Sequence, residues 1–216
     1  YKLKKIFKKK FFLSKLIIPN EKNYKNIKYK IKNRYLRLGI NDENMNFAYT
    51  FSKLIKISEK SFIAGINSFI GLPHRYEIFL KKNNIIFIND SKATSFEATK
   101  YALLNSKNIY WILGGSPKTN DKIILSGLKK NIIKCYLIGE NINFFKKQIQ
   151  NKLNFSITKN IKKTIIQILK DIRLSKRVNN TVLLSPAAAS YDQFVNFEKR
   201  GEEFKRYSKL YARKFI

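Results

Sequence analysis

From Tyr76 onward the sequence alternates between short apolar runs and segments with helical spacing, and this alternation constrains the fold more than any other feature. The runs 76–80 and 85–89 predict a hairpin whose second strand ends at Asn89. After it we expect strands at 109–115, 134–139, 155–158 and 181–186, helices at 96–105, 122–130, 141–152 and 160–173, and a long charged C-terminal helix. Such alternation is typical of parallel strands joined by right-handed crossovers. The pattern predicts an open, mostly parallel α/β sheet with helices on both faces.

The first 70 residues have a different character. Residues 1–36 are basic, with short apolar patches and no clear period, and their opening resembles a basic amphipathic or targeting segment. The chain starts without Met and lysines interrupt the apolar core, so we expect an internal start within a longer protein rather than a signal peptide. Helical spacing over 44–69 predicts a helix pair, with a helix start at Ser58. Pro73 marks a predicted linker, which separates domains 1–70 and 71–216.

The formal net charge of +31 has two explanations. Clustered Lys and Arg bind polyanions by releasing counterions, which makes a basic nucleic-acid-binding α/β protein one hypothesis. The lysines also accompany an abundance of Asn, Ile, Phe and Tyr, which is typical of a coding sequence that has drifted toward A and T. A nucleic-acid groove needs its cations gathered on one face, whereas these lysines are spread along most of the chain. Coding drift is therefore the preferred interpretation.

Several classes of protein are disfavoured by single residues and by composition. Cys135 is the only cysteine, which excludes an internal disulfide, favours a reducing compartment and predicts a small buried thiol. His74 is the only histidine, which disfavours a catalytic triad and a multi-histidine metal site. No apolar run approaches the roughly 18 residues that a membrane span needs. The 44% hydrophobic content is ample for a core.

Polar clusters follow four of the expected strands. Ligands of open α/β sheets bind outside the carboxyl ends of the strands, so these clusters predict the rim of a cleft. The clusters are NDSKATS (89–95), GGSPKTND (114–121), GEN (139–141) and SPAAASYDQF (185–194).

Each cluster permits a functional and a structural interpretation. Asp90 can accept hydrogen bonds from hydroxyls, Lys92 can neutralise phosphate or carboxylate, and Thr94 can donate to an anion, yet Ser95 is equally suited to cap the next helix. GGSPKT lacks the spacing of a Walker A loop, so Lys118 is either a point charge for an anion or a solvated lysine in a tight turn.

The last cluster, SPAAASYDQF, opens the most unusual stretch of the chain, which runs on to Phe204. Its three successive alanines leave room for a ligand beside the backbone, Ser190 offers a hydroxyl, and Phe197 farther along offers an apolar wall. The competing interpretation is a close helix packing contact.

Taken together, GLPHR, NDSKAT, the GG-x-x-K loop and LLSPAAASYDQFVNFEKRGEEF resemble the carboxyl-terminal part of the Mur ligase family, in particular its D-glutamate-adding members. The resemblance runs from about Leu38 to the end, with the four motifs in the family's order. It implies that 1–70 is the end of a central ATPase domain and that 71–216 is a Rossmann-like domain for the incoming amino acid. In this family ATP and Mg²⁺ convert the carboxylate of UDP-N-acetylmuramoyl-L-alanine to an acyl phosphate, which the amine of D-glutamate attacks.

The resemblance also implies residue roles, and a cytoplasmic, monomeric enzyme that uses no membrane and no specific nucleic acid. Its nucleotide-side residues are Asn41, Asn44, His74, Arg75, Asp90 and Lys92, with Asp90 toward the ribose. Its D-glutamate pocket is Thr94, Lys118, Ser190 and Phe197, with Lys118 on a substrate carboxylate. Lys92, Arg75 and Lys118 carry the catalytic role, and no metal ligand is expected in this chain.

The chain departs from the family pattern at several places. Ile40 stands where the family usually has His, Ser95 where Asn is usual, and Ser116-Pro117 replaces an acidic-glycine pair. No P-loop sequence, UDP-binding domain or magnesium-binding lysine or histidine of the central domain is present. We therefore expect a fragment of a ligase or a decayed gene product, inactive alone, and an inactive remnant remains an alternative.

Overall fold

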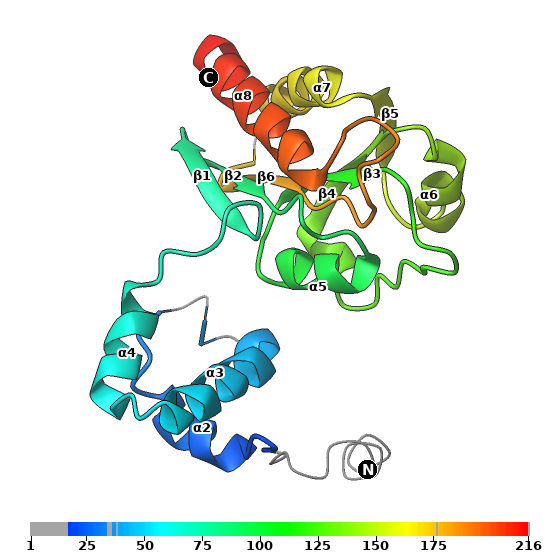
Figure 1. Ribbon diagram of the computed structural model, residues 1–216. Helices are drawn as coiled ribbons and strands as arrows, with labels where there is room; N and C mark the ends of the chain where they lie inside the picture. Colours follow the sequence, from blue (N-terminus) through cyan, green and yellow to red (C-terminus); the bar gives the residue numbers. More distant parts are fainter. Residues whose placement is uncertain (1–16, 34–35, 38, 176, 216) are drawn as a thin grey trace. The chain divides into compact units, whose positions relative to one another are not determined.

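The computed structural model describes residues 17–33, 36–37, 39–175 and 177–215, and it divides into two compact units, Tyr1–Ile70 and Gly71–Ile216 (Figure 1). The basic segment that opens the chain lies outside the described residues up to position 16. The functional identities assigned to the two parts from the sequence stay predictions.

The first unit is a small group of helices. It contains α2 (Glu21–Lys28), the 3₁₀ turn η1 (Gly39–Asn41), α3 (Asp42–Leu54) and α4 (Glu59–Ser68). The last two confirm the expected helix pair, and the Ser58 hydroxyl caps α4 by accepting from the Ser61 N–H at 3.1 Å. α2 begins after an Asn20 cap and was not predicted, because residues 1–36 show no clear apolar period. A buried cluster holds the unit together, and its members are Tyr24, Ile27, Ile31, Met45, Tyr49 and Phe62.

The second unit is built on a six-stranded sheet of order β1-β2-β6-β3-β4-β5. Its strands are β1 (Glu77–Lys82), β2 (Ile85–Asn89), β3 (Ile109–Gly114), β4 (Ile132–Ile138), β5 (Phe155–Lys159) and β6 (Asn180–Leu184). The β1–β2 pair is antiparallel, which confirms the hairpin, and all the other pairs are parallel.

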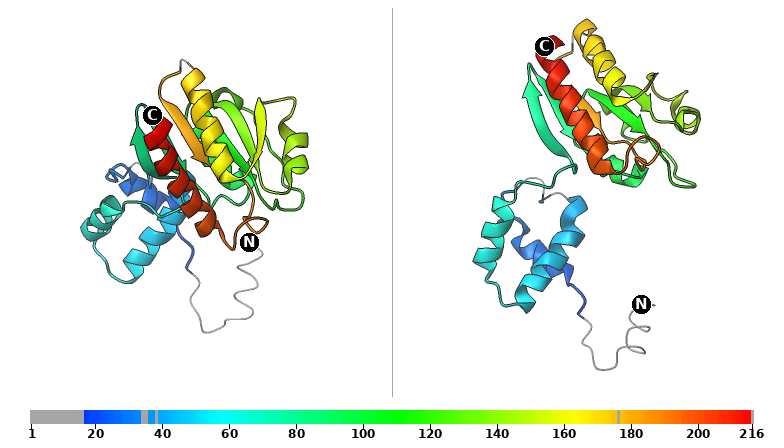
Figure 2. Two further views of the ribbon diagram at one scale, coloured as in Figure 1. Left: turned by 90° about the horizontal axis from the view of Figure 1, so that it is seen from above. Right: turned by 45° about the horizontal axis from the view of Figure 1, so that its top comes forward.

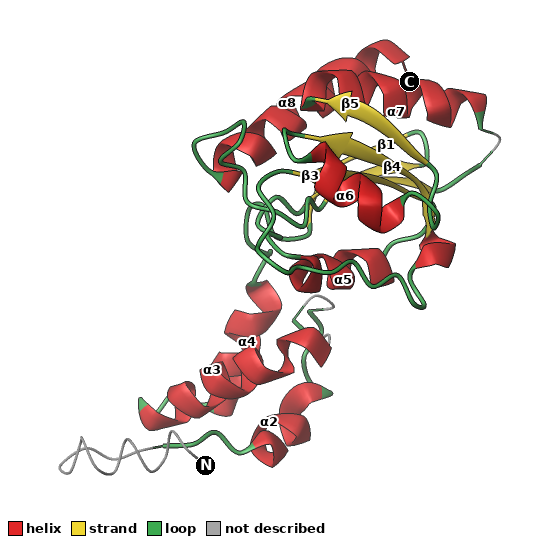
Figure 3. Cartoon of the chain, turned by 90° about the vertical axis from the view of Figure 1, so that its right-hand side faces the viewer, coloured by secondary structure: helices red, strands yellow, loops and turns green. Residues whose placement is uncertain are grey.

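Helices cover both faces of this sheet, as expected (Figures 1 and 3). α5 (Phe96–Leu104) and α6 (Ile142–Ile149) share one buried cluster with Trp111 and Leu113 of β3. α7 (Ile161–Leu174) and α8 (Phe197–Phe215) share another with Tyr110 and Ile112 of the same strand, and they run side by side (Figure 2). Successive residues of a strand point to opposite faces, so β3 fills both layers. The predicted fold class is confirmed, and among the described residues no helix could cross a membrane.

One predicted element is wrong. The sequence predicted a helix at 122–130, but the structure has only the 3₁₀ turn η2 (Lys129–Asn131) there. Ile123 and Leu125 are both buried in the α5 and α6 layer, which is the alternation of an extended segment. The Ile123 N–H donates to the Gln148 side chain of α6 at 2.7 Å, and Gly127 has a φ of +71°. Packing against α6 and the positive φ of Gly127 therefore favour an extended segment over the predicted helix.

The strand order creates a place where the chain changes face. The segments that follow β2 and β3 lie with α5 on one face, whereas β6, which lies between these strands, leads to α8 on the other face. In open α/β sheets a crevice forms where adjacent connections diverge in this way. The crevice is expected at the carboxyl ends of β2, β6 and β3.

Candidate functional site

The loops that follow β3, β4 and β6 are joined to one another by hydrogen bonds. Ser116 and Ala189 form an antiparallel bridge, with N–H to carbonyl distances of 2.9 and 3.0 Å. The Asn141 side chain, from the loop after β4, donates to the Gly115 carbonyl at 3.1 Å. Asp192 accepts from the Glu140 N–H at 3.0 Å. Three of the four polar clusters predicted from the sequence therefore form one continuous rim.

The loop after β2 joins the same rim. The Ser185 hydroxyl, at the end of β6, donates to Asp90 Oδ2 at 2.6 Å. Asp121, at the end of the loop after β3, accepts from the Phe96 N–H at the start of α5 at 2.9 Å. All four clusters thus meet at the carboxyl edge of the sheet, which is the geometric condition for a shared site.

Asp90 is buried, and both of its carboxylate oxygens have partners within the protein. Oδ1 accepts from the Tyr76 N–H at 3.1 Å and Oδ2 from the Ser185 hydroxyl. Burial raises the pKa of Asp90 to about 7, although the two hydrogen bonds and Arg75 oppose the rise. The carboxylate links β6 to the hairpin in this structure, and its predicted contact with a ribose stays a prediction.

His74 is held in one orientation by a network of polar side chains. Asn89 Oδ1 accepts from the Ser91 N–H at 3.3 Å, so Asn89 Nδ2 faces His74 Nδ1, at 2.9 Å, and also donates to Glu77 at 3.0 Å. His74 Nδ1 is therefore the acceptor, which leaves the proton of the neutral ring on Nε2. Glu77 also accepts from the His74 N–H and pairs with Lys205 of α8.

Lys92 and Phe197 lie directly against each other. The Lys92 ammonium is 3.9 Å from the centroid of the Phe197 ring, which is a cation–π contact. The His74 ring meets the same phenyl ring edge-on, with centroids 5.9 Å apart. The predicted nucleotide side and the predicted D-glutamate side therefore share Phe197 as a common wall.

The remaining residues of the predicted D-glutamate pocket lie on the rim loops. Thr94 is half-buried at the end of the loop after β2, Lys118 is exposed in the loop after β3, and Ser190 is buried in the loop after β6. Ser95 accepts from the Ala98 N–H at 3.4 Å and is the N-cap of α5, which agrees with the capping role considered for it in the sequence.

Cys135 is fully buried in β4, as predicted.

Arg75, Asn41 and Asn44 are the other predicted nucleotide-side residues. Arg75 is exposed next to His74. Asn41 and Asn44 belong to the first unit, where Asn41 ends η1 and Asn44 is exposed in the first turn of α3. In the described part of the chain, no group of three or more His, Cys, Asp or Glu is placed to hold a metal ion.

Arg200 is the main site residue that sequence reasoning missed. It lies in the first turn of α8, is 1% exposed, and donates to the loops that follow β2 and β6. The sequence offers no signal for this role, because the acceptors are the Ser91 hydroxyl and backbone carbonyls of two loops elsewhere in the chain.

Sequence comparison identifies relatives of this chain. Two enzymes named UDP-N-acetylmuramoylalanine--D-glutamate ligase are 42% identical over 171 residues (Wolbachia sp. subsp. Brugia malayi) and 34% identical over 197 residues (Rickettsia felis). The chain is a relative of the Mur ligases and matches their carboxyl-terminal part. The two alignments cover 79% and 91% of this chain but only 34% and 44% of those enzymes. No protein-family model matches the chain.

Solved structures agree on the fold. MurF from Acinetobacter baumannii superposes with a TM-score of 0.58 at 14% identity, over 78% of this chain and 38% of that one. A bifunctional folylpolyglutamate synthase/dihydrofolate synthase from Yersinia pestis gives a TM-score of 0.52 at 13% identity, over 78% and 39%. At such identities the match to these Mur ligase and folylpolyglutamate synthase structures supports the α/β architecture alone.

Proposed function

We propose that this chain is the acceptor-amino-acid part of a UDP-N-acetylmuramoyl-L-alanine:D-glutamate ligase, together with the end of its ATP-binding domain. The observation that supports the proposal is the convergence of four loops at one sheet edge. Three of these loops carry Lys92 and Thr94, Lys118, and Ser190, and Lys92 lies against Phe197. Lysines and hydroxyls suit a small dicarboxylate, since both donate to carboxylate oxygens. The choice of D-glutamate as this dicarboxylate rests on the names of the sequence relatives.

In the complete reaction this chain would bind and orient D-glutamate and ATP, and it would not itself activate the muramoyl-alanine carboxylate. Lys118 would pair with a carboxylate of D-glutamate, Thr94 and Ser190 would donate to its oxygens, and Phe197 would close one side. His74, Arg75 and Lys92 would meet the phosphates of ATP, and Asn41 and Asn44 the nucleotide from the first unit. Orientation of this kind lowers the entropic part of the barrier to amide formation. Bound ATP with Mg²⁺ would supply the phosphoryl group that activates the muramoyl-alanine carboxylate.

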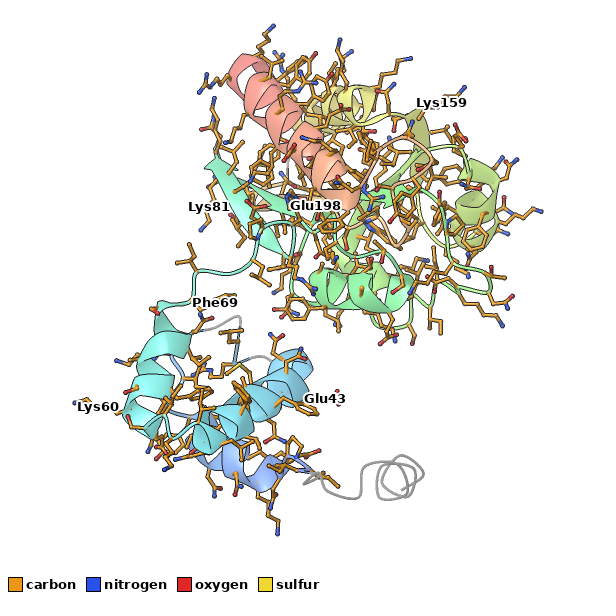
Figure 4. All side chains as sticks on the ribbon, viewed as in Figure 1. Glu43, Lys60, Phe69, Lys81, Lys159 and Glu198 are labelled. Atoms are coloured by element: carbon orange, nitrogen blue, oxygen red, sulfur yellow. The ribbon has the colours of Figure 1, made fainter. Side chains whose placement is uncertain are left out.

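We further propose that this chain does not form the acyl phosphate by itself, because its sequence contains no G-x-x-x-x-G-K-[ST] loop. A cytoplasmic location and a role in peptidoglycan precursor synthesis follow from the same proposal. Lysines on separate elements support coding drift rather than a nucleic-acid groove. Lys81 is on β1 and Lys159 on β5, the two edge strands of the sheet, and Figure 4 labels both.

The proposal is tested by titrating the chain with D-glutamate and with L-glutamate in a calorimeter at physiological ionic strength. We expect saturable binding that prefers D-glutamate, and a loss of about tenfold in affinity in Lys118→Ala, because a charge-assisted hydrogen bond contributes roughly 1.5–3 kcal/mol. Lys81→Ala is the matched control, since this exposed lysine lies at the opposite end of the hairpin from Asn89. Equal affinity in Lys118→Ala and Lys81→Ala contradicts the pocket, and salt-sensitive binding of any DNA or RNA with no response to D-glutamate supports the alternative.

A further inference from the structure

Arg200 has an unusual environment for an arginine. Its side chain is 1% exposed, and its four hydrogen bonds all end on uncharged oxygens. Nε donates to the Ser91 hydroxyl at 3.0 Å and Nη2 to the Ser91 carbonyl at 2.8 Å. Nη2 also donates to the Ala188 carbonyl at 2.9 Å, and Nη1 to the Ala189 carbonyl at 3.2 Å. One side chain therefore binds the loop after β2 and the loop after β6 together.

The third rim loop also lies against this guanidinium. A Cβ atom added to Gly115 would be 3.1 Å from Arg200 Nη1 and 2.2 Å from the Ala189 carbonyl oxygen. Gly115 has a φ of +132°, which only glycine adopts readily. The GG pair thus lets the loop that carries Lys118 approach both Arg200 and the alanine run. Arg200 lies at the point where NDSKATS, GGSPKT and SPAAAS meet.

A charge at this position is costly, so its presence requires an explanation. Burial lowers the pKa of Arg200 to about 10, with the Asp192 carboxylate opposing the change, so the side chain stays protonated at neutral pH. A buried cation costs free energy unless hydrogen bonds and charges compensate for it. Three backbone carbonyls and a hydroxyl accept four of the five guanidinium N–H donors, and Asp192 acts on the charge without forming an ion pair with it. The positive charge close to these loops favours an anion bound at the rim.

The contacts of Ser91 extend the influence of Arg200 to the aromatic wall. The Ser91 hydroxyl accepts from Arg200 and donates to the Phe197 carbonyl at 2.8 Å. Phe197 in turn contacts Lys92 and His74. The position of the rim loops and the position of the wall between the two predicted ligands therefore depend on the same guanidinium.

We propose that Arg200 is a positioning residue of the acceptor site, which fixes the loops after β2 and β6 in register and provides a buried positive charge that favours the carboxylates of the acceptor amino acid. The second part rests on the proposed function, whereas the first concerns the loops alone. Lysine cannot replace it fully, because a single ammonium has no planar fork to reach acceptors in both loops.

The two parts are tested separately with Arg200→Met, Arg200→Lys and the control Ser208→Ala. Ser208 is buried on the same helix and its hydroxyl has no partner, so its removal leaves the loops unchanged. Hydrogen–deuterium exchange on the unliganded chain is expected to accelerate in peptides covering 89–95 and 186–190 in both Arg200 variants, while β3 and β4 stay protected. Unchanged exchange in both loops overturns the positioning role, and uniform acceleration across the sheet shows a merely structural role, which also overturns it.

The affinity of the two variants for D-glutamate then distinguishes the effect of the Arg200 charge from the effect of its hydrogen-bond geometry. We expect Arg200→Met to lose about tenfold or more, and Arg200→Lys to lose less because it keeps the charge. Equal losses in the two variants overturn the electrostatic part. If the unsubstituted chain binds no D-glutamate, the proposed function fails, while the exchange comparison still decides whether Arg200 orders the loops.

Discussion

Asp90 is a buried carboxylate that links two segments of the fold, and its contribution to the free energy of unfolding depends on pH. Its oxygens bind Tyr76 of the hairpin and Ser185 of β6, so it joins two segments that are far apart in sequence. Both bonds are donated to the carboxylate, yet burial dominates and raises its pKa to about 7. The ionised form is therefore disfavoured in the folded protein relative to the unfolded chain.

We predict that Asp90 lowers the free energy of unfolding as pH rises from about 4 to about 7. Across this window the folded state keeps a proton that the unfolded chain, with a pKa near 3.8, has released, so stability falls with rising pH. The full effect is roughly 4 kcal/mol, at about 1.36 kcal/mol per pKa unit. Urea unfolding of the wild type and of Asp90→Asn at pH 5 and pH 8 measures it. Asn can keep both contacts, so the variant should lack the fall, and parallel pH profiles would contradict the prediction.

Individual residues were predictable where their chemistry is visible in a short motif. Lys92, Lys118 and Ser190 stand out because each belongs to a polar cluster that follows a strand, and all three lie in loops of the rim. Arg200 was not predictable from spacing, because its importance comes from carbonyl groups of loops that precede it by many residues. Backbone acceptors leave no signature in a sequence, whereas charged side chains do.

At the scale of elements, α8 closes the site by approaching the His74 loop very closely. A Cβ atom added to Gly201 would lie 2.2 Å from His74 Nδ1 and 2.9 Å from Asn89 Oδ1. The His74 ring cannot simply move aside, because Asn89 and Phe197 hold it on two sides. The absence of a side chain at Gly201 is therefore what lets the helix pack at this distance.

We predict opposite effects for alanine at two helical glycines. Gly201→Ala should destabilise the second unit by about 1–3 kcal/mol, because overpacking outweighs the gain in helix propensity. Gly65→Ala in α4 is the matched control, since nothing lies within 4 Å of the added atom. It should stabilise the first unit by about 0.5–1 kcal/mol. Denaturant unfolding monitored by circular dichroism checks both predictions. Stabilisation by Gly201→Ala would contradict the first, because it would show that the His74 loop moves to accommodate a Cβ atom.

Strong periodicity made most elements predictable, and long-range packing explains those that were not. The strands and the helices α5, α6 and α7 were expected within a few residues, because each carries its own apolar pattern, and α8 was expected as a long charged helix without stated bounds. Residues 122–130 also contain apolar residues at mixed spacing, but they were fixed by α6 and by a glycine with positive φ. α2 buries Tyr24 and Ile27 alone, which is too weak a stripe to detect among lysines.

At the scale of the molecule, the two units have separate cores. Among the residues that the structure describes, the buried cluster of the first unit contains six, and the two clusters of the second unit are much larger and include none of these six. A small core offsets less of the conformational entropy of its chain. We therefore expect the first unit to be the less stable of the two.

This difference in stability predicts two unfolding transitions, which two spectroscopic probes can follow separately in the same sample. Trp111 is the only tryptophan, and it is fully buried in β3, so its fluorescence follows the second unit alone. Circular dichroism in the far ultraviolet follows helices of both units. In urea, the dichroism should begin to change before the fluorescence does, since non-coincident probes indicate more than two states.

D-glutamate provides the decisive comparison for this prediction. A ligand that binds only the folded second unit stabilises it by RT ln(1 + [L]/Kd), which is about 2.7 kcal/mol at 100 times Kd. The fluorescence transition should therefore move to higher urea while the early dichroism change stays in place, and in Lys118→Ala the shift should shrink. Coincident transitions that move together would show instead that the two units unfold as one, because ligand bound to the second would then stabilise the first equally.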